Sequence, residues 1–434
     1  MEKTAGKTEI AILAIWFGLL CVLVHYIVTT PILRYESEQA VYFKIQDFHY
    51  CIVMIRSFWS HEIASIYDPM SQLDVVRSHF GIAMNQAMSI GHSPTILLIL
   101  LPFSLVTRIS FPLANTLWVS AFLTVFSVAV LKMGAHLLQY ERNRIPVFIA
   151  AYSVFLLSFR AVTVIFLGQT TLLASGLLLF LLLEITLARK EGRSLRRGLV
   201  YPILFILSIK LHYLALGLAI LLIGGYIHEM LASVAIVAVS VATLIAYSGP
   251  DLLMGFLEQL SVFSTTELPA YYDMTYIFHT FITFRNAFAP IIGASLSLKI
   301  SMIVLALGCV ALCWIFVPRY GEWRKGRKHI DGTTPEQGIV TLFALPLLFM
   351  PYIGGYEDIL MIIPFSTAFL VPNCIQKHGK IIALLPFLFV VLNQRVMFSS
   401  DHLWLYWGMK ASIFVFLFYL LKESTFGREF SDGR

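Results

Sequence analysis

The chain has 434 residues, of which 58% are hydrophobic and 13% charged, and its mean hydropathy is +0.81. Soluble domains hold about 45–50% apolar residues, so this composition excludes a water-soluble fold of this size. The net charge of +6 does not indicate nucleic-acid binding, because the basic residues lie in short clusters between apolar runs. We therefore expect one membrane domain over residues 1–434 and no nucleic-acid partner.

The first apolar run extends from Ile10 to Leu33 and follows two lysines. It is too long for the hydrophobic part of a signal peptide and lacks a small-residue cleavage site, so it predicts a retained first span. Residues 34–93 are then a large first extracytoplasmic loop that carries juxtamembrane helices. Within this loop, apolar residues at helical spacing after Asp47 predict an amphipathic helix over about 48–59.

The basic clusters set the predicted topology, because cytoplasmic loops are enriched in Lys and Arg. Dense clusters at 189–197 and 319–328 are placed inside, together with both termini. Residues 94–131 then hold one span and a juxtamembrane helix. The later predicted spans are 145–163, 170–188, three short spans within 198–247, 288–317, 338–353, 359–374, 381–394 and 403–421.

The predicted architecture is an all-α polytopic bundle of about twelve transmembrane helices. A break near Lys210 and His212 separates two of the short spans, and residues 249–285 form a second extracytoplasmic loop. Five scattered cysteines make no disulfide framework or paired zinc motif.

Unusual polar residues gather on the predicted outer side. Ionisable groups at membrane depth are costly unless they are paired or hydrated, so they indicate a site, although many such side chains simply reach the wet interface. Asp47 follows the first span and has two open interpretations: a general base or a helix N-cap. Histidines such as His49 and His92 form no spaced metal-binding pair, so no metal site is predicted.

Several motifs resemble a known family when they are read in order. They are Gln46-Asp47-Phe48, Ser65-Ile66-Tyr67-Asp68-Pro69, Ser93-Pro94, Leu167-Gly168-Gln169-Thr170, Ile209-Lys210, and Pro351-Tyr352 through Tyr356-Glu357-Asp358. Over about residues 41–372 the chain resembles glycosyltransferase family 87. These are C-type (GT-C) membrane glycosyltransferases, similar to polyprenol-phosphate-mannose-dependent α-mannosyltransferases.

The resemblance implies an inverting hexosyltransferase in the cytoplasmic (inner) membrane of a bacterium, with its active site on the extracytoplasmic face. A hexose, mannose by default, would pass from a polyprenyl-phosphate donor to a hydroxyl of a glycolipid or glycan, without a cofactor or metal. Asp47 occupies the position of the family's catalytic base. The candidates for the donor phosphate are Lys210, Arg160, Gln169 and Arg285, and those for the acceptor or sugar are His49, His92, His212, Tyr356, Glu357 and Asp358.

The sequence departs from the family pattern at three places. Glu357-Asp358 stands where many members have paired histidines, Ser93-Pro94 stands where many have a double proline, and His212 replaces a common proline. These departures concern the sugar and the acceptor rather than the fold.

Two other functions remain open. A transporter or lipid flippase often shows internal repeats, and none is visible here. A membrane acyl or phosphoryl transferase requires a nucleophile or metal cluster that the sequence does not identify.

Overall fold

The computed structural model describes residues 47–80, 91–138, 168–264 and 291–316, with isolated positions at 164–165, 288, 342, 360, 408, 411–413 and 415. The predicted spans over 10–33, 145–163 and 338–421 therefore fall almost wholly outside the described residues. Within the described part the chain forms helices and no strand, which confirms the all-α class.

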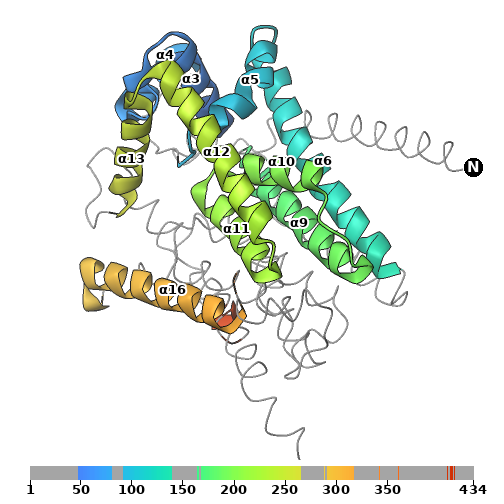
Figure 1. The fold of residues 1–434 in the computed structure, drawn as a ribbon. Coiled ribbons are helices and arrows are strands. Elements are labelled where there is room, and N and C mark those ends of the chain that lie inside the picture. The colour runs from blue at the N-terminus through green and yellow to red at the C-terminus, as the bar shows by residue number, and fades with distance from the viewer. Residues whose placement is uncertain are drawn as a thin grey trace, which may run out of the picture.

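Eleven helical elements make up the described part of the chain. They are α3 (Asp47–Trp59), η2 (Ile63–Ser65), α4 (Pro69–Phe80), α5 (Ile96–Thr107), α6 (Phe111–Leu138), α9 (Thr171–Glu191), α10 (Arg197–Leu207), α11 (Leu211–Gly224), α12 (Ile227–Ser248), α13 (Asp251–Ser264) and α16 (Ala294–Phe316). Figure 1 shows α6 and α9 through α12 as a bundle, with α3, α4 and α13 at one end of it.

Three described helices are long and apolar enough to cross a membrane. They cover Phe111–Met133 of α6, Thr171–Glu191 of α9 and Ile227–Ser248 of α12. A helix rises about 1.5 Å per residue, so each matches a hydrocarbon core of about 30 Å. Helices α5 and α6 agree with the prediction of one span and a juxtamembrane helix over 94–131, and α9 agrees with the predicted span over 170–188.

Of the three short spans predicted over 198–247, the third agrees with α12, whereas α10 and α11 differ from the first two. Helices α10 and α11 have 11 and 14 residues, about 16 and 21 Å, which is too short for either to cross a bilayer alone. A Cβ on Gly217 of α11 would lie 2.5 Å from Leu204 Cδ2 and 3.0 Å from Leu207 Cδ1 of α10. The two helices are thus antiparallel and closely packed, and they form a hairpin whose tip is residues 208–210.

The position of this hairpin follows from its contacts with α9. At its open end, the Arg196 backbone N–H donates to Glu184 at 2.9 Å, and a Cβ on Gly224 would lie 3.5 Å from Ile185. Near its tip, the Tyr213 hydroxyl lies 2.8 Å from the Thr171 hydroxyl at the start of α9. The hairpin therefore enters the bundle from the Glu184 end and turns back at the level of Thr171.

Close backbone packing joins α6 to α9. A Cβ on Gly176 would lie 2.8 Å from both the backbone N and Cα of Phe126, and the neighbouring Trp118 and Leu178 are fully buried. Small residues allow membrane helices to approach this closely. Gly176 is thus a packing residue of the bundle.

We expect Gly176→Ala to lower the apparent melting temperature of the detergent-purified protein. Alanine normally favours a helix over glycine by about 1 kcal/mol, but overpacking against a backbone that cannot move costs about 1–3 kcal/mol. Gly198→Ala is the matched control, since a Cβ there meets nothing within 4 Å. An equal or higher melting temperature for Gly176→Ala than for Gly198→Ala would contradict this packing.

Helix α3 is buried on nearly all sides. The prediction of a helix here was correct, but the prediction that it is amphipathic, with one face exposed, was wrong. Ten of its 13 residues are buried. The ring of Phe48 lies 5.5 Å from those of Phe111 and Trp118, while Trp59 at the far end is 49% exposed. The start of α3, where Asp47 lies, is therefore anchored in the core.

Helix α13 occupies the first part of the predicted second loop, 249–285. Its Phe256 ring lies 5.5 Å from the Tyr67 ring, and a Cβ added to Gly255 would lie 3.3 Å from Tyr67 Cβ. The two predicted extracytoplasmic loops thus contact each other through Tyr67. Residues 265–285 lie outside the described part.

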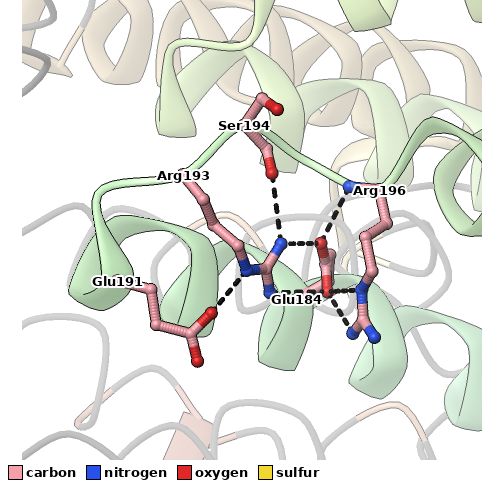
Figure 2. A network of polar contacts seen from close by, with 5 residues as sticks. All are labelled: Glu184, Glu191, Arg193, Ser194 and Arg196. Carbon is pink, nitrogen blue, oxygen red and sulfur yellow. Dashed lines mark hydrogen bonds and ion pairs between the residues drawn. The ribbon is translucent and has the colours of Figure 1, made fainter.

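At the other end of the bundle, two arginines enclose one buried carboxylate (Figure 2). Arg193 donates to both oxygens of Glu184, at 2.6 and 3.2 Å, and Arg196 donates to it through Nε, Nη2 and the backbone N–H at 2.8, 2.5 and 2.9 Å. The side chain of Glu184 is fully buried. This network fixes the turn between α9 and α10 and hence the base of the hairpin.

We expect Glu184→Ala to lower the free energy of unfolding by about 2–4 kcal/mol. Hydrogen bonds to charged groups are worth about 1.5–3 kcal/mol each, and both arginines are partly exposed, so water recovers part of the loss. The control is Glu191→Ala, which removes an ion pair of Arg193 whose carboxylate is 52% exposed and should cost less than about 1 kcal/mol. Thermal unfolding of the two variants compares them, and equal losses would contradict the central role of Glu184.

Candidate functional site

The tip of the α10–α11 hairpin is fastened to a segment that lies more than a hundred residues earlier in the chain. The Ser93 backbone N–H donates to the Ile209 carbonyl at 2.7 Å, and the Ser93 hydroxyl donates to the Ser208 carbonyl. The Thr95 hydroxyl accepts from Ser208 at 2.9 Å and lies 2.7 Å from that of Ser93. These bonds hold residues 92–95 and 208–210 together.

Lys210 is the last residue of this tip, and its cationic side chain is buried. It is the N-cap residue of α11, with extended backbone angles, and only 5% of it is exposed. Its Nζ lies 5.5 Å from the centroid of the Tyr213 ring, a cation–π contact. A buried ammonium group at the end of a re-entrant hairpin is a site for an anion or a carboxylate.

Asp47 supplies such a carboxylate from the first turn of α3. It is partly buried, and burial raises its pKa from 3.8 to about 6, against the opposing effect of the Lys210 charge. The carboxylate is therefore ionised at neutral pH but is a stronger base than an exposed aspartate. A carboxylate of this kind can remove a proton from a bound hydroxyl.

His92 lies near the same cation, next to Ser93, which is bonded to the hairpin tip. It is 2% exposed, and the Tyr67 hydroxyl donates to its carbonyl at 3.1 Å. Burial lowers the pKa of its imidazole well below 6.5, and the charges of Lys210 and His212 lower it further. Lys210 thus acts electrostatically on both Asp47 and His92.

Gln169 and Thr170 reach the region from a tight turn before α9. Gly168 takes a left-handed conformation there, with φ of 65°, and the Trp118 indole N–H donates to its carbonyl at 3.1 Å. Gln169 is 5% exposed and Thr170 is 2% exposed. The next residue, Thr171, contacts Tyr213 of α11 and so connects this turn to the hairpin tip.

Two further predicted residues lie near the site but differ in their surroundings. The ring of His212 lies 4.2 Å from that of Tyr213, and its charge acts on His92. His49 is buried, with its ring 4.6 Å from that of Phe111, so it packs into the core between α3 and α6.

The structure thus brings Asp47, His92, Lys210 and His212 into one region, and the turn that holds Gln169 joins it through the contact of Thr171 with Tyr213. The sequence suggested these residues from four separate stretches. The remaining predicted site residues, Arg160, Arg285, Tyr356, Glu357 and Asp358, lie outside the described residues. In the described ranges, no group of three or more His, Cys, Asp or Glu side chains is arranged to hold a metal ion.

The residues that build the scaffold of the site were not predicted from the sequence. Ser208, Thr95 and Tyr213 carry the hydroxyl contacts that hold the tip to residues 92–95 and to α9. Tyr213 lies three residues after Lys210, one helical turn away, and this spacing is the one signal that links it to the cation. The serine and threonine hydroxyls have no such signal.

Comparisons of the chain with protein-family models, curated proteins and solved structures gave no match.

Proposed function

We propose that this protein is an integral-membrane inverting glycosyltransferase that moves a hexose from a polyprenyl-phosphate donor to a hydroxyl of a glycolipid or glycan. The observation that carries the proposal is the buried Lys210 at the hairpin tip, whose charge acts on both Asp47 and His92. A transferase of this kind needs a base for the acceptor and a cation for the phosphate leaving group. The ordered motifs that resemble glycosyltransferase family 87 include Asp47, Gln169 and Lys210.

In the proposed reaction, an acceptor hydroxyl attacks the anomeric carbon of the donor sugar. A bond forms between the acceptor oxygen and that carbon, the bond from the carbon to the phosphate oxygen breaks, and the proton passes to the Asp47 carboxylate. Polyprenyl phosphate leaves as an anion. Lys210 stabilises the growing negative charge, with hydrogen bonds from Gln169 as a further contribution.

The placement of basic residues supports an extracytoplasmic site. Arg189, Lys190, Arg193, Arg196 and Arg197 lie at the end of the bundle opposite the hairpin tip. Short loops rich in Lys and Arg remain in the cytoplasm, so we place that end inside and the site outside. Donor and acceptor would then meet at the outer leaflet of a bacterial cytoplasmic membrane.

The experiment is an incubation of the purified protein with labelled polyprenyl-phosphate mannose, glucose and galactose and a membrane lipid extract. Mass spectrometry of the products identifies both the donor and the acceptor. We expect one hexose to appear on a lipid or glycan, with release of polyprenyl phosphate. If all three donors remain intact under conditions in which the protein stays folded, the proposal is wrong.

One observation favours a transporter as a second candidate. Short helices that meet at a charged tip within a bundle are typical of transporter binding sites. Proteoliposomes distinguish the two functions: movement of a solute without transfer of a hexose would favour a transporter.

A further inference from the structure

Three buried side chains of the candidate site have polar atoms without a hydrogen-bond partner among the described residues. They are both ring nitrogens of His92, Oε1 of Gln169 and Oγ1 of Thr170. Each such atom costs about 1–3 kcal/mol, and folded proteins contain few of them. In His92 both ring nitrogens lack a partner within the described part of the chain, so neither the donor nor the acceptor of its side chain is used there.

The position of His92 is fixed, although its ring has no hydrogen-bond partner among the residues that the structure describes. Its carbonyl accepts from the Tyr67 hydroxyl at 3.1 Å, and the next residue, Ser93, is bonded to Ile209 and Ser208 of the hairpin tip. Tyr67 in turn packs on Phe256 of α13. The backbone is therefore held from two sides while the imidazole itself is left to bind something else.

The charge of the ring determines what it can bind. Burial and the nearby charges of Lys210 and His212 lower the pKa of His92, so the imidazole is neutral at pH 7. A neutral imidazole has one N–H donor and one nitrogen acceptor, whereas a charged one has two donors. A hydroxyl group can both accept and donate a hydrogen bond and so matches a neutral imidazole, and sugars carry several hydroxyl groups.

We propose that His92 hydrogen-bonds a hydroxyl of the donor sugar and thereby selects which sugar is transferred. The inference rests on the proposed function and adds the specificity residue of that site. His92 lies beside Lys210, which we assign to the donor phosphate, and the donor sugar is bonded directly to that phosphate. The charge of the same lysine also acts on Asp47 of α3, which we assign to the acceptor.

The inference makes an unusual prediction for stability. If the ring serves a substrate rather than the fold, His92→Phe removes two unpartnered polar atoms and raises the melting temperature of the substrate-free protein. A histidine with a structural role would show the opposite effect. The control is His136→Phe, which changes a buried histidine in the last turn of α6, close to Lys190 and Glu191 at the opposite end of the bundle.

The substrate test compares the hexose donor that the wild type uses in the panel above with the four forms of that donor that each lack one hydroxyl. A site built to bond a hydroxyl rejects the analogue that lacks it, so we expect the wild type to lose about 10- to 100-fold in kcat/KM for one deoxy donor. His92→Phe should treat that donor and the parent alike, within about 3-fold. His136→Phe should keep the wild-type preference.

The outcomes separate this inference from the proposed function. If the wild type transfers no sugar, both the proposed function and the role of His92 are wrong. If the wild type transfers sugar and His92→Phe keeps the full preference, or if no single hydroxyl matters to the wild type, the role of His92 is wrong and the proposed function stands. Should His92→Phe fail to fold, His92→Gln replaces it: a changed preference among the donors supports the inference, and an unchanged one overturns it.

Discussion

We expect Asp47→Asn to lower the rate of sugar transfer by about 10²- to 10⁴-fold, which is the usual contribution of a positioned general base. Asparagine has nearly the same shape, so it keeps the packing at the start of α3 but cannot accept a proton. The measurement is the initial rate of labelled product formation at saturating donor. Asp74→Asn is the matched control, because Asp74 is an exposed residue of α4, and its rate should equal that of the wild type.

The same substitution should stabilise the protein above pH 6. The pKa of Asp47 is raised from 3.8 to about 6 in the folded state, so the folded protein binds more protons than the unfolded chain between these values. Stability therefore falls as the pH rises from about 4 to above 6, by at most about 3 kcal/mol. Asp47→Asn removes this loss, so its melting temperature should exceed that of the wild type at pH 8 and match it near pH 4.

Two results would contradict this role for Asp47. One is a rate of Asp47→Asn within 3-fold of the wild type, which would show that another group removes the proton. The other is a wild-type kcat/KM that does not fall below pH 6, since protonation of Asp47 removes the base.

We expect Lys210→Gln to reduce kcat/KM by about 10²- to 10³-fold, the usual cost of losing a group that stabilises developing negative charge. It should also move the acidic limb of the pH–rate profile to higher pH, because the Lys210 charge lowers the pKa of Asp47. The measurement is the pH dependence of kcat/KM between pH 5 and pH 9.

Two controls accompany this variant. Lys210→Arg keeps the charge and should restore part of the rate and the position of the acidic limb. Lys132→Gln changes an exposed lysine near the end of α6 and should alter neither. An acidic limb in Lys210→Gln that coincides with that of the wild type would separate Lys210 from Asp47 and contradict the proposed site.

Local patterns in the sequence predicted the parts of the fold that depend on neighbouring residues. Apolar runs predicted the helices α6 and α9, and apolar spacing after Asp47 predicted α3. The burial of α3 on all sides was not predictable from its own residues, because it results from contacts with Phe111 and Trp118 far along the chain.

The hairpin of α10 and α11 is a second feature that the sequence did not predict. The polar break at Lys210 was visible, but two short apolar helices on either side of a break have the same composition whether they cross a membrane or turn back within it. Close packing of Gly217 on Leu204 and the contact of Tyr213 with Thr171 determine the turn, and both are tertiary contacts.

The sequence predicted those parts of the candidate site whose chemistry belongs to a single residue. It did not predict the parts that depend on contacts between distant residues. Asp47 and Lys210 were singled out as ionisable residues near span ends. The bonds of Ser93 to Ser208 and Ile209 join residues 115 or more positions apart and leave no local pattern. Only the folded chain shows that the ring nitrogens of His92 have no hydrogen-bond partner in the described ranges.

The proposed chemistry depends on one carboxylate, Asp47, that deprotonates an acceptor for direct displacement of the phosphate. The anomeric configuration of the product reports on this step, and NMR of the isolated product measures it through the coupling at the anomeric carbon. A single displacement predicts a configuration opposite to that of the donor. Retention of the donor configuration would require two successive displacements through a second nucleophile, and it would contradict the role assigned to Asp47.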